Sequence, residues 1–283
     1  MLRQLLLLTL LCSTIHAELP KSWTEAFPAH KIAGNLYYVG SRDLASYLIT
    51  SKEGHILINS SLEESVPLIK NSVEQLGYKF SDIKILLISH AHSDHCAGSA
   101  EIIRQTGAKH FVMEQDAAAV ESGGGAPKSR LNKADYTKFP PAKVDRGLKD
   151  GEEVRLGDAT LIAHRTPGHT PGCTTWTTRV LDGDKVLDAV IIGSPNVNPG
   201  YMLVNNKTYP NIATDYEQCF RVLKSLPCDL FLGAHGGYYG MEAKHPLLGT
   251  SKTNPFVDPE GYRRYVSEKE DAFRKEWERQ KSR

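Results

Sequence analysis

Four potential metal ligands lie within six residues of one another in this sequence. They directly follow the nearly continuous apolar run 83–88, and they are His90, His92, Asp94 and His95. Residues two apart in an extended backbone point to the same side, so His90 and His92 can bind one metal ion. If the chain then turns, Asp94 and His95 can face a second ion. Imidazole and carboxylate ligands together favour zinc over magnesium or calcium.

Two more histidines lie in glycine-rich turns and complete a set of six ligands. His169 lies in Gly-His-Thr-Pro-Gly, and His235 lies in Gly-Ala-His-Gly-Gly after a short apolar run. Glycine allows the backbone to approach a metal ion closely. The alternative is a purely structural role, but burying so many polar groups at a strand end without a metal ion is costly. The remaining histidines have no partner ligands nearby in the sequence, and we expect structural roles for His30, His55, His110, His164 and His245.

The hydrophobic pattern predicts the elements that position these ligands. Short apolar runs between turn signals predict strands at 36–39, 45–50, 55–59, 83–88, 111–113, 153–156, 160–163, 174–179, 186–192 and 230–232. Apolar residues at helical spacing predict helices at 64–76, 97–106, 215–225 and 262–277. The order of strands, helix, strand and helix, followed by much the same again, predicts two packed sheets with helices outside, in one domain.

Composition and charge exclude several classes of protein. The chain has 283 residues, of which 40% are hydrophobic and 24% are charged, which is typical of a globular protein. Lysine and arginine (34) almost balance aspartate and glutamate (33). No bulk field would attract nucleic acid or an anionic membrane, so we expect neither as a partner.

The N-terminus has the pattern of an export signal. Arg3 precedes an apolar run at 5–11, and Ala17 offers a small residue at a cleavage point. We expect a signal peptide at 1–17 and a single mature domain at 18–283, located in a periplasm or outside the cell. The apolar run is too short to span a bilayer, and no later run is long enough. A retained anchor or an uncleaved end is the alternative.

Two other features leave alternatives open. Cys219 and Cys228 flank the corner between a predicted helix and a strand, and they could form a disulfide or remain buried free thiols. Cys96 is either a small core residue or a thiol acidified at a helix start.

The glycine-rich segment 121–141 is predicted to be a surface loop that lies over the site.

His-x-His-x-Asp-His after a strand, then Gly-His-Thr-Pro-Gly and Gly-x-His-Gly, resembles the metallo-β-lactamase superfamily. The resemblance covers residues from about 30 to 265 and implies a four-layer αβ/βα sandwich, an α/β fold. It also implies two zinc ions per chain, the first held by His90, His92 and His169. The second would be held by Asp94, His95 and His235. The substrate stays open at this point, since thioester, phosphodiester, lactone and β-lactam hydrolases share these ligands.

The second residue after strand 186–192 narrows the resemblance to one subclass of the superfamily. Many members of the superfamily have a bridging aspartate there and one class has a cysteine, whereas this chain has Ser194. It therefore resembles the subclass B3 metallo-β-lactamases, which implies that a metal-bound hydroxide opens the β-lactam ring. Asp94 would also orient that nucleophile, and the substrate would contact Ser194, Asn196 and Tyr201. Ser93 replaces an aromatic residue common in the family and leaves more space beside the metals.

Other functions fit the same ligands less well. A secreted zinc lactonase or a thioesterase resembling glyoxalase II is disfavoured by the missing aspartate and by the export signal. A nuclease is disfavoured by the neutral charge. From another class, a zinc-binding protein without turnover is disfavoured by the complete ligand set. The expected partner is a small β-lactam molecule, with no membrane after signal cleavage and no obligate protein partner.

Overall fold

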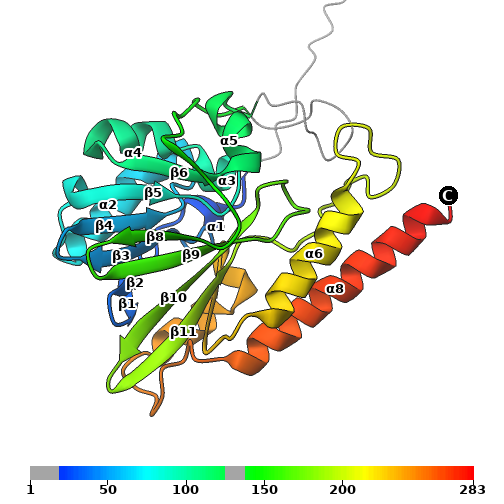
Figure 1. The fold of residues 1–283 in the computed structure, drawn as a ribbon. Helices are drawn as coiled ribbons and strands as arrows, with labels where there is room; N and C mark the ends of the chain where they lie inside the picture. The colour runs from blue at the N-terminus through cyan, green and yellow to red at the C-terminus, as the bar shows by residue number, and fades with distance from the viewer. Residues whose placement is uncertain (1–18, 125–137) are drawn as a thin grey trace, which may run out of the picture.

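Two β-sheets pack face to face, with helices on both outer sides (Figure 1). The computed structural model describes residues 19–124 and 138–283. The predicted signal at 1–17 and the middle of the predicted loop 121–141 lie outside the described residues. The predicted fold class, a four-layer sandwich of two mixed sheets with helices outside, is confirmed.

The first sheet has seven strands in sequence order, β1 to β7. The strands are His30–Ala33, Leu36–Tyr38, Tyr47–Ser51, Gly54–Ile58, Ile83–Leu87, Lys109–Met113 and Arg146–Leu148. Strands β1 to β4 pair antiparallel through short turns, and β4 to β7 pair parallel. Parallel pairing brings the carboxyl ends of β4, β5 and β6 to one edge of the sheet, where the chain after β5 carries the first predicted ligands.

The second sheet has five strands in the order β12-β11-β10-β9-β8. Strands β8 to β12 are Glu152–Leu156, Ala159–Arg165, Thr174–Asp182, Lys185–Ile192 and Leu230–Gly233. Only β11 and β12 pair parallel, with Ile191 opposite Leu232. The segments that follow these two strands therefore leave the sheet at the same edge, and they carry Ser194 and His235.

The main core lies between the sheets and is largely apolar. Trp176 on β10 is the largest fully buried side chain, and its indole nitrogen donates to the carbonyl of Ile88 just after β5, at 3.1 Å. Tyr47 on β3 is also buried, and its hydroxyl donates to the carbonyl of Gly233 on β12, at 2.7 Å. Both bonds join the two sheets beside the ligand-bearing segments, and they fix the distance between those segments.

Helices cover the outer faces of both sheets. The helices α1 to α8 are Lys21–Thr24, Val66–Gln75, Ser93–Cys96, Ser99–Thr106, Glu114–Glu121, Ile212–Ser225, Met241–Lys244 and Pro259–Lys281. Val73 on α2 and Ile102 on α4 pack on the first sheet. Helices α6 and α8 lie side by side over the second sheet, where Tyr216 stacks on Phe273 (Figure 1). Among the described residues, no helix is long and apolar enough to cross a membrane.

Several short elements were not predicted, and for β1, β7 and α5 the physical reason is clear. Strand β1 packs on β2 around a register shift that breaks its alternation. Strand β7 has three residues, one of them glycine, and is held by pairing with β6. Helix α5 has little amphipathic character, since its buried residues are Asp116 and Val120. Helix α8 extends beyond the predicted 262–277 at both ends, and its start is capped by Asp258, whose side chain accepts from the amide of Gly261.

The disulfide between Cys219 and Cys228 is not formed, and both thiols are free. Cys219 lies on the buried face of α6, within the main core. Cys228 follows Pro227, and its thiol donates to the carbonyl of Leu230 at 3.4 Å. The second of the two alternatives, free thiols, therefore holds.

Candidate metal centre

The segment after β5 turns sharply at His92, and this turn separates the ligands into two groups. His92 has an extended backbone (φ −111°, ψ 151°) and begins α3. Its carbonyl accepts from the amides of His95 and Cys96 at 2.9 and 3.0 Å. Before this turn the amide of His92 donates to the carbonyl of His90 at 3.0 Å, so the chain bends at Ala91 and is not extended from His90 to His92 as the sequence analysis expected. The two histidines precede a single helical turn that carries Asp94 and His95.

The first group consists of His90, His92 and His169, as predicted. Nε2 of His169 lies 3.1 Å from Nδ1 of His92. The ring of His90 lies 4.6 Å, centroid to centroid, from the rings of both His92 and His169. Ligand atoms of all three lie within 4.8 Å of one another, close enough to bind one ion.

The second group is centred on Asp94. Its Oδ2 atom lies 3.2 Å from Nε2 of His95 and 3.5 Å from Nε2 of His235. His90, Asp94 and His95 also have ligand atoms within 4.8 Å of one another, so the two groups adjoin at His90. All six predicted ligands are therefore brought to one place in the fold.

The donor set fits zinc. Burial lowers the pKa of His90 well below its ordinary value, so the ring is neutral, as a metal ligand must be. Its buried Nε2 atom makes no hydrogen bond within the described part of the chain. Nδ1 of His169 donates to the carbonyl of Asn196 at 2.8 Å, which leaves the lone pair on the Nε2 atom that faces His92.

Asp43, which the sequence analysis missed, orients His235. Its carboxylate accepts from Nδ1 of His235 at 2.9 Å and from the amide of Gly237 at 3.0 Å. Burial alone would lower the pKa of His235, but Asp43 and Asp94 raise it to about 9. The pKa of Asp94 is well below its ordinary value: burial would raise it, but the neighbouring His95 and His235 outweigh burial. Without a cation, protonated His235 therefore balances these carboxylates.

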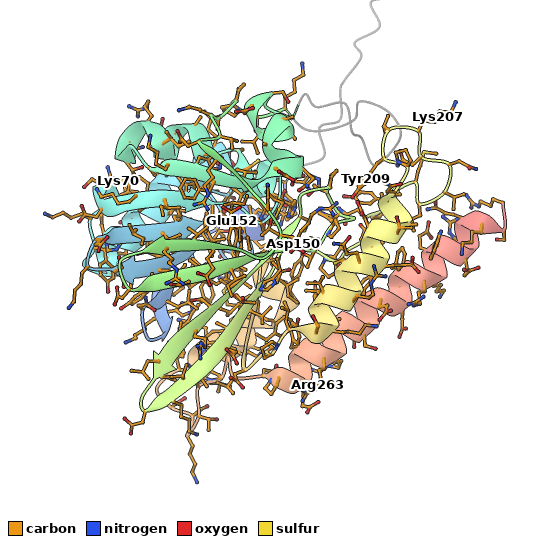
Figure 2. The ribbon with its side chains drawn as sticks, in the orientation of Figure 1. Lys70, Asp150, Glu152, Lys207, Tyr209 and Arg263 are labelled. Carbon is orange, nitrogen blue, oxygen red and sulfur yellow. The ribbon has the colours of Figure 1, made fainter. Side chains whose placement is uncertain are left out.

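A second network holds the turn that carries His169. The hydroxyl of Tyr216 donates to the carbonyl of Asn196 at 2.6 Å, the same oxygen that fixes His169. Arg165 donates to the carbonyl of Pro171 at 2.9 Å and pairs with Asp215. Tyr209, which Figure 2 labels, lies in the loop that leads into α6. Its hydroxyl donates to Asp215 at 2.6 Å. The turn is thus fixed from β9 and from α6.

A cavity of about 1140 Å³ opens beside the ligands. Outside the ligand set, its lining includes Trp23, Asp43, Ser93, Asn196, Asn198 and Tyr238. Nδ2 of Asn196 donates to the hydroxyl of Tyr238 at 2.8 Å, so these two polar groups form one wall. The predicted contact Asn196 lies at the cavity.

The other two predicted substrate contacts do not line the cavity. Ser194 is buried, with its hydroxyl 3.3 Å from that of Tyr238, and it lies behind the wall. Tyr201 is buried with its hydroxyl 3.4 Å from Nδ1 of His169, so it supports that ligand instead of forming a wall. Gln280 at the end of α8 donates to the carbonyl of Tyr201 and accepts from the amide of Leu203, both at 2.7 Å.

Three further predictions concern Ser93, Cys96 and the histidines outside the motifs. Ser93 lines the cavity, on the side of α3. Cys96 is fully buried, and burial raises the pKa of its thiol well above the ordinary value, which favours the core role over the acidified thiol. The other histidines lie outside both ligand groups, and the ring of His110, for example, contacts the carbonyl of Lys143.

Asp43 and Tyr238 were missed for different reasons. Asp43 belongs to no motif and reaches His235 only through the packing of the first sheet's loops on β12. Tyr238 lies three residues after His235, in the 3₁₀ turn Gly236–Tyr238. Its proximity to a predicted ligand is the one signal that could have indicated it.

The fold and the paired ligand groups define a metallo-hydrolase of a known type. The family model of the metallo-β-lactamase superfamily matches residues 42–235. The chain belongs to this superfamily. Within it, the chain is similar to the subclass B3 metallo-β-lactamases.

Solved structures support that grouping. The native FEZ-1 metallo-β-lactamase from Legionella gormanii is 53% identical, with a TM-score of 0.88, over 92% of this chain and 99% of that one. BJP-1, a subclass B3 metallo-β-lactamase of Bradyrhizobium japonicum, is 37% identical with a TM-score of 0.86, over 93% and 98%. The class B3 di-zinc enzyme LRA-12, from an Alaskan soil metagenome, is 33% identical with a TM-score of 0.86, over 92% and 98%.

Curated relatives are more distant in sequence. A hydroxyacylglutathione hydrolase of Rhodopseudomonas palustris is 26% identical over 209 residues, which are 72% of this chain and 67% of that protein. The mitochondrial persulfide dioxygenase of Homo sapiens is 27% identical over 133 residues, 46% of this chain and 42% of that protein.

Proposed function

We propose that this chain is a zinc-dependent hydrolase that opens the β-lactam ring of antibiotics, as a subclass B3-type β-lactamase. The observation that carries this proposal is the complete pair of ligand groups beside one cavity, in a chain 53% identical to a native metallo-β-lactamase over nearly its whole length. The presence of Ser194 at the end of β11, where related hydrolases have a bridging aspartate, also supports it.

We propose two zinc ions per chain. His90, His92 and His169 would hold the first, and Asp94, His95 and His235 the second. When bound, the ions supply Lewis acidity and make water ionise near neutral pH. The di-zinc description of a structural relative supports the same stoichiometry.

The residues of the chain have separate tasks in this reaction. Asp94 carries negative charge at the centre of the second group and can accept a hydrogen bond from the attacking nucleophile. Asp43 holds the ring of His235 in one tautomer. Bound ions would supply positive charge beside the leaving ring nitrogen, so no protein group would have to act as a general acid.

The wall formed by Asn196 and Tyr238 would bind the carboxylate that penicillins, cephalosporins and carbapenems share. In this proposal Asn196 and Ser194 both donate to the oxygen of Tyr238, at 2.8 and 3.3 Å, so that the proton of the Tyr238 hydroxyl is available for a ligand. Burial raises the pKa of Tyr238 above its ordinary value, so the hydroxyl stays a donor at neutral pH.

Export is part of the proposal. The pattern of residues 1–17 predicts a cleaved signal, with residues 18–283 as a single mature domain in a periplasm or outside the cell. This location would place the enzyme where β-lactams meet the enzymes of wall synthesis.

Initial rates of hydrolysis test the function. The purified chain, supplied with zinc, is assayed on a carbapenem and on a chromogenic cephalosporin, and then again with a chelator. Fast turnover that the chelator abolishes, and that His92→Ala removes, is expected. His164→Ala is the matched control, because His164 pairs with Thr177 on the second sheet and belongs to neither ligand group.

The contrary outcomes identify the alternatives. Zinc-dependent hydrolysis of a lactone or of a glutathione thioester, with none of a β-lactam, would replace the proposed substrate. Stoichiometric zinc without hydrolysis of any of these substrates would leave a zinc-binding protein without turnover.

A further inference from the structure

Asp116 is a buried carboxylate beside the metal centre that none of the sequence motifs includes. It lies in the first turn of α5 and is 1% exposed. Its Oδ2 atom accepts from the amide of Ala91 at 2.9 Å and from the hydroxyl of Thr170 at 2.6 Å. Its Oδ1 atom accepts from the amide of Gly172 at 2.8 Å.

These three donors belong to the two segments that carry the first ligand group. Ala91 lies between His90 and His92, whereas Thr170 and Gly172 follow His169. One carboxylate therefore joins two turns that are far apart in sequence, at the place where their histidines must meet.

The glycine at position 172 is needed for this contact. A Cβ atom there would lie 2.6 Å from the backbone nitrogen of Asp116 and 2.7 Å from its Cβ and Cγ atoms. Backbone atoms at this distance cannot move aside without displacing α5. The turn after His169 is thus packed directly against the start of that helix.

We propose that Asp116 is a positioning residue that sets the separation of His169 from His90 and His92, and thereby the zinc affinity of the first ligand group. It is not a ligand itself, because it belongs to neither group of converging ligand atoms and its oxygens point to the three donors. Hydrogen bonds to an ionised acceptor are roughly twice as strong as neutral ones, and a buried carboxylate depends on them. The inference rests on the zinc binding of the proposed function and not on its substrate.

The test measures zinc binding without turnover. The metal-free full-length chain is titrated with zinc against a chromophoric chelator, as wild type, Asp116→Asn and Asp116→Ala. Asparagine keeps one acceptor oxygen but turns an amide hydrogen toward a donor. Asp116→Asn should therefore weaken zinc binding at one of the two sites by about 10-fold. Alanine removes the bonds to Ala91, Thr170 and Gly172 and should weaken zinc binding at that site by about 100-fold.

Two further variants identify the affected site and exclude a general loss of structure. In a His235→Ala background, which disables the second group, the remaining zinc site should still lose affinity when Asp116 is replaced. Asp145→Asn is the matched control: Asp145 also accepts a backbone amide, that of His110 at 3.1 Å, but at the end of the first sheet. Its zinc affinities should equal those of the wild type.

A purely structural role would lower the melting temperature of the metal-free chain and leave the zinc affinity of the folded protein unchanged. That outcome for Asp116→Ala would overturn the inference.

If Asp116→Ala does not fold, Thr170→Val tests the inference in its place, because it removes one hydrogen-bond donor at nearly constant shape. A several-fold weaker first site supports the inference, and an unchanged affinity overturns it. A wild-type chain that binds no zinc would overturn the proposed function as well, whereas failure confined to the variants would overturn only the role of Asp116.

Discussion

The carboxylate of Asp43 lies 2.9 Å from Nδ1 of His235, although 192 residues separate the two in the sequence. The bond holds one imidazole proton on Nδ1, so a metal ion at the second group would displace the other proton, from Nε2, which lies 3.5 Å from Asp94. The second ligand group therefore depends on a residue that binds no metal.

Replacing Asp43 by alanine should weaken zinc binding at the second group by about 10- to 100-fold, because His235 loses both its orientation and its basicity. Stepwise zinc titration of the metal-free chain measures this effect. Asp82→Ala, which removes an exposed carboxylate near Lys84, should leave both affinities unchanged. Equal weakening of both sites by Asp43→Ala would contradict a specific role at His235.

Tyr238→Phe should raise KM for a β-lactam by roughly 10-fold or more, with a smaller change in kcat, since it removes a hydrogen bond to a charged group. Ser194→Ala should raise KM by only a few-fold, because Ser194 lies behind Tyr238 and does not line the cavity. Steady-state kinetics of the two variants on one substrate compare them directly. A larger effect of Ser194→Ala would place the substrate carboxylate at the position that the resemblance first implied.

Removal of zinc should lower the thermal stability of the chain. A ligand at about 100 times its dissociation constant adds roughly 2.7 kcal/mol to the free energy of unfolding, which raises the melting temperature by roughly 5 to 10 °C for a domain of this size. Thermal melts with zinc and with a chelator measure the difference. In His92→Ala the rise in melting temperature caused by zinc should be clearly smaller. An undiminished rise would mean that zinc stabilises the chain by binding outside the first ligand group.

The unfolding free energy should fall in mild acid because of His110. Burial lowers the pKa of its ring to about 4 from 6.5. The unfolded chain therefore binds a proton at this position below about pH 6.5 while the folded chain does not, so stability is lost as the pH falls toward 4. Between pH 7 and pH 5 the loss due to this group is about 2 kcal/mol.

Urea unfolding of the metal-free chain at both pH values, with His110→Gln for comparison, measures this contribution. Glutamine does not titrate, so the variant should lose about 2 kcal/mol less than the wild type over this range. Identical losses in the two proteins would show that His110 is charged in the folded state or that its pKa is ordinary.

The ligands could be predicted from the sequence because their geometry is largely local. His90 and His92 lie on either side of a tight turn at Ala91, and a single helical turn places Asp94 and His95. His169 is marked by its own glycine-rich turn. The sandwich itself follows from the order of apolar runs, since most strands contain an alternating or a continuous apolar segment.

What could not be predicted depends on contacts between distant segments. Asp43 is one of many aspartates until the first sheet packs against β12. The burial of Tyr201 beneath His169 follows from Gln280, 79 residues further on, which fixes the loop from the end of α8. The free thiol of Cys219 is likewise decided by which face of α6 meets the core.

The contact between Gln280 and Tyr201 bears on when the metal centre can form. Gln280 follows all six predicted ligands in the sequence, so during synthesis it leaves the ribosome after every one of them. The loop that supports His169 can then dock through this contact only after α8 has been synthesised. A chain translocated before folding would consequently acquire its metal ions from the compartment in which it arrives.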